Sequence, residues 1–182
     1  MPRTLKVAIA GLGPAGQAVA RAVLQVPALK LVAVADPAPL NAGKDVGTVL
    51  GLPRKIRVKV EGNPDRFFKK VRADVAFVCT SSLLKDVKPQ IAALVSRRVN
   101  VLTTCEELAW PVPARAAAFK ELDRLAKRKK VSVLATGVNP GFAMDTLALA
   151  LTAPCARVRR VSVTRVVDAA ARKLPLQRRV GA

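Results

Sequence analysis

The sequence has no histidine and no tyrosine, and only 3% of its 182 residues are aromatic. So few aromatic rings leave few platforms on which the bases of a single-stranded nucleic acid could stack. The three cysteines, Cys79, Cys105 and Cys155, are odd in number, far apart and not spaced as metal ligands. They therefore predict reduced thiols in the cytoplasm, with neither a disulfide framework nor a metal site.

Acidic residues are also scarce, with 12 Asp and Glu against 32 Lys and Arg, so the formal net charge is +20. The basic residues gather over 54–72, 115–130 and 157–179. Such a field would attract polyanions. The blocks match no groove-reading motif, however, and we interpret them as solvated helix faces and strand edges, without a nucleic-acid partner.

No apolar run is long enough to cross a membrane, because the candidate over 142–154 is short and carries Asp145. The N-terminus imitates a secretory signal, with Arg3 and Lys6 before small apolar residues. The glycine motif in the same segment explains it better, so we expect a cytoplasmic protein without a membrane partner. A hydrophobic fraction of 51% is ample for a folded core.

The most informative stretch runs from Lys6 to Asp36, where an apolar run enters Gly11-x-Gly13-x-x-Gly16. In this pattern the first glycine permits a tight turn, the second lets backbone amides approach a pyrophosphate, and the third lets the helix pack closely. A carboxylate at Asp36 can bind the adenosine ribose, which favours NAD and leaves NADP possible. The alternative is a structural turn that binds nothing. The predicted cofactor residues here are Gly11, Gly13, Pro14, Ala15, Gly16 and Asp36.

Short apolar strands then alternate with amphipathic helices. Strands are predicted over 6–10, 31–36, 56–60, 74–80, 100–104 and 131–136, and helices over 15–25, 64–71, 85–96, 113–128 and 142–151. A loop is expected over 39–53. This alternation predicts an α/β fold, a doubly wound parallel-sheet Rossmann domain with helices on both faces.

The pattern changes after Pro154. Residues 157–168 alternate valines with hydroxylated residues and predict a longer strand, with no later strand for it to pair with before Ala182. We therefore expect a Rossmann domain over 1–154. Residues 155–182 are expected to begin an incomplete second domain for substrate binding and dimerisation.

Chemistry is expected at the carboxyl ends of the strands, where ligands bind in open α/β sheets. The turn over 79–82 is small and hydroxylated, so its chain could pass close beneath a bound dinucleotide. Alternatively, Ser81 or Ser82 simply caps the next helix, and the two interpretations are equally favoured. The turn over 137–141 offers an amide that could hold the nicotinamide carboxamide. The further predicted cofactor residues are Cys79, Thr80, Ser81, Thr104 and Asn139.

Two acids, Glu106 and Glu107, directly follow the fifth predicted strand. They could simply favour the first turn of a helix. Alternatively, one of them is the general base, with its pKa raised by burial beside an apolar wall such as Trp110. The neighbouring Cys105 has no basic sequence neighbour to lower its pKa, so we expect it to pack rather than react.

Three motifs, TCEELAWP from Thr104, ATGVNPGFAMD from Ala135 and TRVVDAAARKLPLQRRVG from Thr164, resemble a known family. They are similar to the 2,4-diaminopentanoate dehydrogenases and equally to the related native amine dehydrogenases, within the dihydrodipicolinate-reductase-like superfamily. The resemblance implies a homodimer that deaminates an amine oxidatively, with hydride passing to NAD(P)+. It also implies a catalytic glutamate after the fifth strand, which maps onto the acid pair, with Glu107 preferred over Glu106.

Those enzymes are longer, and the half that is missing here forms their substrate pocket, lid and much of the dimer contact. An open site loses desolvation and substrate positioning, so we expect impaired catalysis unless another chain supplies that half. One alternative is dihydrodipicolinate reductase, whose paired-histidine and lysine signature this sequence lacks. Another is a non-catalytic dinucleotide-binding module.

Overall fold

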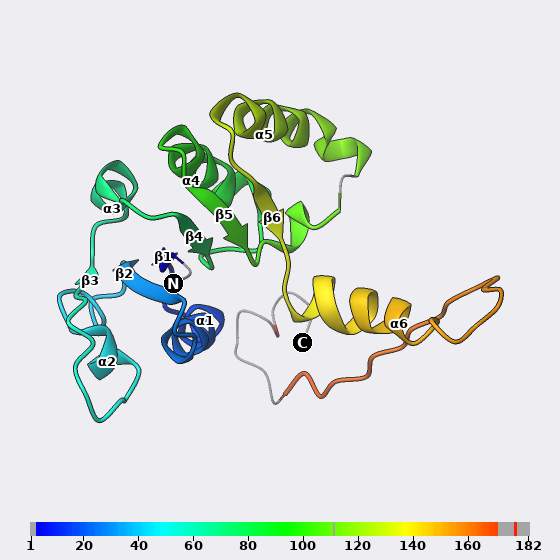
Figure 1. Ribbon diagram of the computed structural model, residues 1–182, viewed down its shortest axis with the longest axis horizontal. Coiled ribbons are helices and arrows are strands. Elements are labelled where there is room, and N and C mark those ends of the chain that lie inside the picture. The colour runs from blue at the N-terminus through cyan, green and yellow to red at the C-terminus, as the bar shows by residue number, and fades with distance from the viewer. Residues whose placement is uncertain (1–2, 111, 171–176, 178–182) are drawn as a thin grey trace.

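The computed structural model describes residues 3–110, 112–170 and 177, and their core is one parallel sheet (Figure 1). The strands lie in the order β3-β2-β1-β4-β5-β6, the doubly wound order of a Rossmann domain. The predicted fold class is thereby confirmed. The strands are β1 (Leu5–Ala10), β2 (Leu29–Ala35), β3 (Val60–Glu61), β4 (Val75–Val78), β5 (Asn100–Thr103) and β6 (Val133–Ala135).

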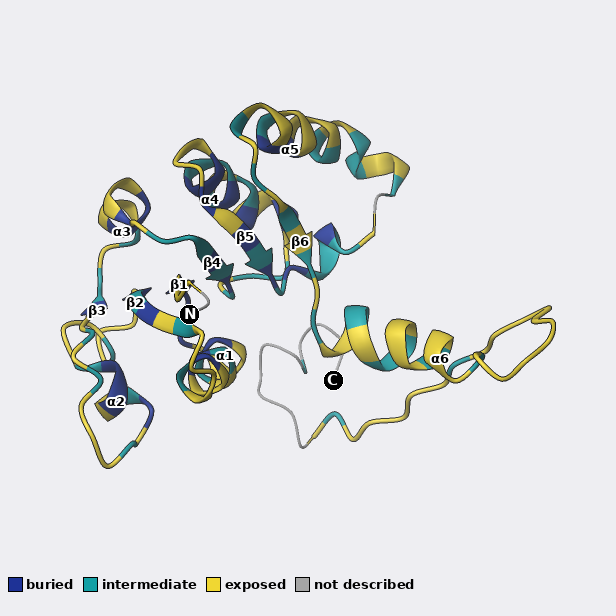
Figure 2. Cartoon of the chain, in the orientation of Figure 1, coloured by how far each residue is buried: buried dark blue, intermediate teal, exposed yellow. Residues whose placement is uncertain are grey.

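Helices cover both faces of the sheet, because the central strands are apolar on both sides. Side chains Val7 and Ile9 of β1 pack in the cluster that includes α1 (Pro14–Gln25) and α2 (Val46–Val49). Ala8 and Ala10 pack in the second cluster, with α3 (Pro64–Lys70), α4 (Leu84–Ser96) and α5 (Ala116–Lys129). All four β1 residues are at most 2% exposed, and the strands are dark blue in Figure 2 where they are buried.

The short helices lie at the carboxyl edge of the sheet. They are η1 (Glu106–Leu108), η2 (Pro113–Arg115), η3 (Val138–Thr146) and α6 (Leu147–Ala150). The helix predicted over 142–151 forms over nearly the same residues, within η3 and α6, and non-helical backbone at Asn139, Pro140 and Gly141 precedes it. No helix among the described residues is long and apolar enough to span a membrane.

The strand predicted over 56–60 is wrong except at its last residue. Its backbone groups bond to the preceding loop instead: Val58 O accepts from Val46 N–H at 2.8 Å, and Ile56 N–H donates to Asp45 Oδ1 at 2.8 Å. Asp45 also forms an isolated antiparallel bridge with Lys59. The loop predicted over 39–53 also contains a short helix, α2, which its composition did not predict.

The strand predicted over 157–168 is also absent. These residues run as exposed, irregular chain beyond α6, orange in Figure 1 and mostly yellow in Figure 2, and Val166 is 92% exposed. A strand needs a neighbour for its amides and carbonyls, and within the described ranges none pairs with this segment. Of the second-domain region expected over 155–182, residues 171–176 and 178–182 lie outside those ranges.

Candidate functional site at the carboxyl edge of the sheet

The three glycines of the turn between β1 and α1 meet different surroundings. Gly11 has a φ of 92°, and a Cβ built on it would lie 2.8 Å from Cys79 O. A Cβ on Gly16 would lie only 1.8 Å from Gly11 O. Gly13 has nothing within 4 Å of its Cβ position. The first and third glycines are therefore required by packing, whereas the second faces open space that a ligand could fill.

The first turn of α1 is suited to an anion. Its N-cap is Gly13, which offers no capping side chain, and no acid lies in the first turn. Pro14 occupies the first helical position, where a missing N–H costs nothing. The following backbone amides and the positive end of the helix dipole are available for a pyrophosphate.

Asp36 is 7% exposed and fixes the glycine turn from the end of β2. Its Oδ2 accepts a hydrogen bond from Leu12 N–H at 2.6 Å, and its Oδ1 accepts one from Ala38 N–H at 2.9 Å. Each carboxylate oxygen can accept a second bond, so the predicted ribose contact is compatible with this geometry. The Asp36 carboxylate therefore also stabilises the glycine turn, a role that the sequence pattern alone did not indicate.

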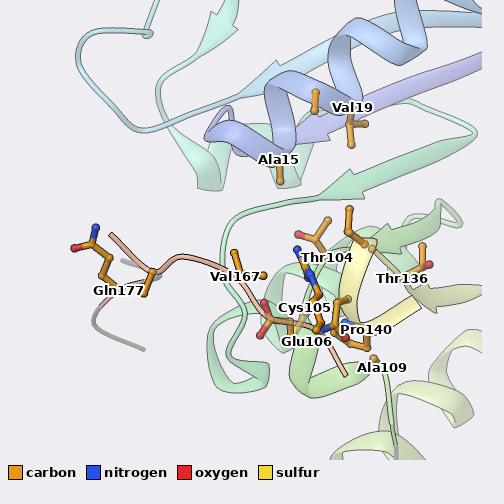
Figure 3. Close-up of a pocket in the computed structure, with 16 residues that line it drawn as sticks. Ala15, Val19, Thr104, Cys105, Glu106, Ala109, Thr136, Pro140, Val167 and Gln177 are labelled. Atoms are coloured by element: carbon orange, nitrogen blue, oxygen red, sulfur yellow. The ribbon is translucent and has the colours of Figure 1, made fainter. Parts of the chain in front are cut away.

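A cavity of about 820 Å³ opens between α1 and the ends of β5 and β6. Figure 3 shows Ala15 and Val19 on one wall, with Thr104, Cys105 and Glu106 on the other. Of the predicted site residues, the cavity brings together Ala15, Thr104, Glu106 and Asn139.

Glu107 does not line this cavity, although the family resemblance implied it in preference to Glu106. Its Oε2 accepts from Leu84 N–H at 2.8 Å, and its Oε1 lies 2.6 Å from Arg115 Nη2. Trp110 is 74% exposed and provides no buried wall beside either acid. The acid that reaches the cavity is Glu106.

The turn over 79–82 directs its polar groups away from the cavity. Thr80 Oγ1 is 2.8 Å from Gln90 Oε1, and Ser81 Oγ donates to Asp86 Oδ2 at 2.8 Å. Ser81 Oγ also accepts from Leu83 N–H at 3.1 Å, but Leu83 is the N-cap residue of α4 and the helix has no capping side-chain bond, so the alternative in which Ser81 or Ser82 caps it is wrong. Cys79 packs beneath the glycine turn, with its backbone close to Gly11 and its Cβ beside Gly16.

The two cysteines near the site are suited to packing. Burial raises the pKa of the Cys79 thiol to about 11, partly offset by a hydrogen bond from Thr104. Burial likewise raises the pKa of Cys105, whose Sγ donates to Ser82 O at 3.2 Å. Both thiols are protonated near neutral pH and are poor nucleophiles. No cluster of three metal-ligating side chains occurs within the described ranges.

Sequence reasoning missed the third side of the cavity, which the segment 165–169 and Gln177 contribute. Arg165, Val167 and Gln177 line it, and Arg165 is the one cation among the described lining residues. Figure 3 shows Val167 and Gln177 on this side. The motif beginning at Thr164 contained these residues, but a predicted strand gave no indication that they return to the cavity.

The sheet order, the glycine turn and the cavity at the carboxyl edge define a dinucleotide-binding Rossmann protein. More particularly, the chain belongs to the oxidoreductase family with an NAD-binding Rossmann fold, which matches residues 5–137. Membership of an NAD-binding family confirms the cofactor predicted from the glycine motif.

Individual relatives agree with the resemblance to amine dehydrogenases. The 2,4-diaminopentanoate dehydrogenase of Acetoanaerobium sticklandii is 35% identical over 167 residues, which is 89% of this chain and 46% of that protein. The structure of an amine dehydrogenase from Mycobacterium smegmatis matches with a TM-score of 0.72 and 26% identity, covering 82% of this chain and 44% of its own.

The fold extends to more distant proteins. The scyllo-inositol dehydrogenase of Lactobacillus casei, solved with NAD(H) and scyllo-inositol, matches with a TM-score of 0.54 and 18% identity, covering 73% of this chain and 36% of its own. At this identity the match shows the fold alone. This chain spans about half the length of the relatives that it matches.

Proposed function

We propose that this chain is the nucleotide-binding part of an NAD-dependent oxidoreductase that acts on the CH–NH2 group of a small amine. The observation that carries the proposal is Glu106 at the cavity between the start of α1 and the end of β5, in a chain 35% identical to a diamine dehydrogenase. The volume of about 820 Å³ suits a nicotinamide together with a small substrate.

The reaction converts a protonated amine, NAD+ and water into a carbonyl compound, ammonium, NADH and a proton. NAD+ supplies the hydride acceptor when it is bound. Glu106 is assigned the proton transfers at the substrate, first at the amine nitrogen and then at the water that attacks the imine carbon. A general base must reach such a proton within about 3 Å or through one water.

Other residues bind and orient. The glycine turn and the amides at the start of α1 hold the pyrophosphate, and Asp36 holds the adenosine ribose. Thr104 and Asn139, both on the cavity, are assigned to the nicotinamide carboxamide. Cys79, Thr80 and Ser81 support this edge from beneath the glycine turn rather than by direct contact with substrate.

Arg165 bears on which amine is taken. A guanidinium and an acid that line the same cavity suit a substrate that carries a carboxylate beside its amine, as 2,4-diaminopentanoate does. We therefore assign to Arg165 the binding of a substrate carboxylate. A parent protein that turned over simple amines as well as it does 2,4-diaminopentanoate would contradict this assignment.

The function is tested in two stages. Calorimetric titration should give binding of NAD+ and weaker binding of NADP+. Assays with 2,4-diaminopentanoate and simple amines should then give NADH formation that Glu106→Gln lowers by about 10²-fold or more, a typical loss for a general base. Glu121→Gln, on the surface of α5, is the matched control.

Loss of activity in both variants, or in neither, would contradict the role of Glu106. Cofactor binding without turnover of any amine, even when a second chain supplies the missing half, would contradict the amine dehydrogenase and support the non-catalytic dinucleotide-binding module instead.

A further inference from the structure

We infer that Glu107 is a positioning residue, which holds the turn η1 so that its neighbour Glu106 faces the nicotinamide end of the cavity. This inference rests on the proposed role of Glu106. Glu107, the second acid of the pair, then has a role separate from proton transfer.

The first contact is with the start of α4. Glu107 Oε2 accepts a hydrogen bond from Leu84 N–H at 2.8 Å, and Leu84 is the first residue of that helix. The helix has Leu83 at its N-cap position and therefore no capping side chain of its own. Glu107 fulfils that task from 23 residues away along the chain, and a negative charge at a helix N-terminus is favourable.

The second contact is with the start of α5. Glu107 Oε1 pairs with Arg115 Nη2 at 2.6 Å, and Arg115 is the N-cap residue of α5. Side-chain exposure is 27% for the acid and 37% for the base, so solvent screens the pair only in part. The Glu107 backbone adds a bond to Ser82 O at 3.3 Å. One residue thus connects η1 to both neighbouring helices.

These contacts matter because η1 has only three residues and little stability of its own. Successive side chains of a 3₁₀ turn point about 120° apart. With Glu107 fixed towards α4 and α5, Glu106 must project in a different direction, and the cavity lies there. If Glu107 itself transferred protons at the cavity, it would have to break both of its contacts.

The test compares the affinities of NADH and ADP-ribose, which differ by the nicotinamide part of the cofactor. Glu107→Ala should loosen η1 and the adjoining Thr104, which is assigned to the carboxamide, so NADH binding should weaken about three- to tenfold while the affinity for ADP-ribose stays unchanged. Glu107→Gln keeps an acceptor for Leu84 N–H and should recover part of the loss. A purely structural role would weaken both ligands alike.

The matched control is Glu121→Ala, which removes another acid that joins α4 to α5, through Lys88 at 2.5 Å, on the outer surface. It should leave both affinities unchanged. Arg115→Ala gives a milder test if Glu107→Ala does not fold, with a smaller loss for NADH alone.

Equal losses for NADH and ADP-ribose in the Glu107 and Arg115 variants, or no loss for either ligand, would overturn the inference. Amine turnover plays no part in this measurement. Failure of the proposed reaction would therefore not be mistaken for failure of the positioning role.

Discussion

Gly13 is the residue at which a substitution should weaken ligand binding with the least effect on folding. Space is open where its side chain would stand, so Gly13→Val should fold with little change in melting temperature. The added branch would occupy the room of the phosphate oxygens, and the dissociation constant for NAD+ should rise by about tenfold or more. Calorimetry and thermal melting of the same variant measure the two effects.

Gly16→Ala is the contrasting variant, because its Cβ would lie 1.8 Å from a backbone oxygen. It should destabilise the fold itself. If Gly13→Val bound NAD+ as tightly as the parent, the glycine turn would serve the fold only.

The sequence indicated the positions of the candidate site residues, but it did not indicate the directions of their side chains. The glycines, Asp36 and the acid pair were all located by their positions at strand ends. The choice between Glu106 and Glu107 depended on Leu84 and Arg115, whose approach comes from tertiary packing. The side chains of neighbouring residues in a 3₁₀ turn point about 120° apart. Only one of the two acids can therefore face the cavity, and the sequence does not show which.

Among the elements, the segment from Asp45 to Lys59 depends on a single carboxylate. Hydrogen bonds from backbone amides, that of Ile56 first, then those of Gly47 and Arg57, lower the pKa of Asp45 below its ordinary value of 3.8. Because the folded pKa is depressed, its stabilising contribution is fully present above pH 3.8 and is lost as the pH falls through the folded value.

We therefore expect Asp45→Asn to lower the free energy of unfolding relative to the parent above pH 3.8, with the difference shrinking in stronger acid. Urea unfolding at a series of pH values measures this. Hydrogen exchange at Gly47, Ile56 and Arg57 should accelerate in the variant. A difference that persists unchanged at low pH would contradict the assignment of the effect to this carboxylate.

Two strand predictions were largely wrong, because a strand forms only where a neighbouring strand pairs with it. Residues 56–59 have the composition of a strand, but their amides bind Asp45 and the loop beside α2. Residues 157–168 have the alternation of a strand, but no described neighbour pairs with them. In contrast, β1, β4 and β5 are buried between two helical layers, and their continuous apolar runs were sufficient evidence.

Over the whole molecule, the net charge of +20 opposes the compact state through self-repulsion. Five ion pairs join described residues, and their carboxylates are between 25% and 64% exposed, so the pairs offset little of this repulsion. Sodium chloride should therefore stabilise the fold by screening.

Raising sodium chloride from about 0.05 to 0.5 M shortens the Debye length several-fold and should raise the melting temperature by about 2–4 °C, equivalent to about 1 kcal/mol. An equal concentration of an uncharged osmolyte controls for effects unrelated to charge. A melting temperature that falls with salt would mean that attractive pairs outweigh the repulsion.

The uncapped start of α1 has a further consequence. A helix that begins at a glycine, without a capping side chain or an early acid, leaves its first amides to solvent until a pyrophosphate arrives. The pyrophosphate then supplies partners for these amides, so cofactor binding stabilises the start of α1. Adenosine, which has the ribose but no phosphates, would leave these amides to solvent, whereas ADP would bind them and so stabilise the helix.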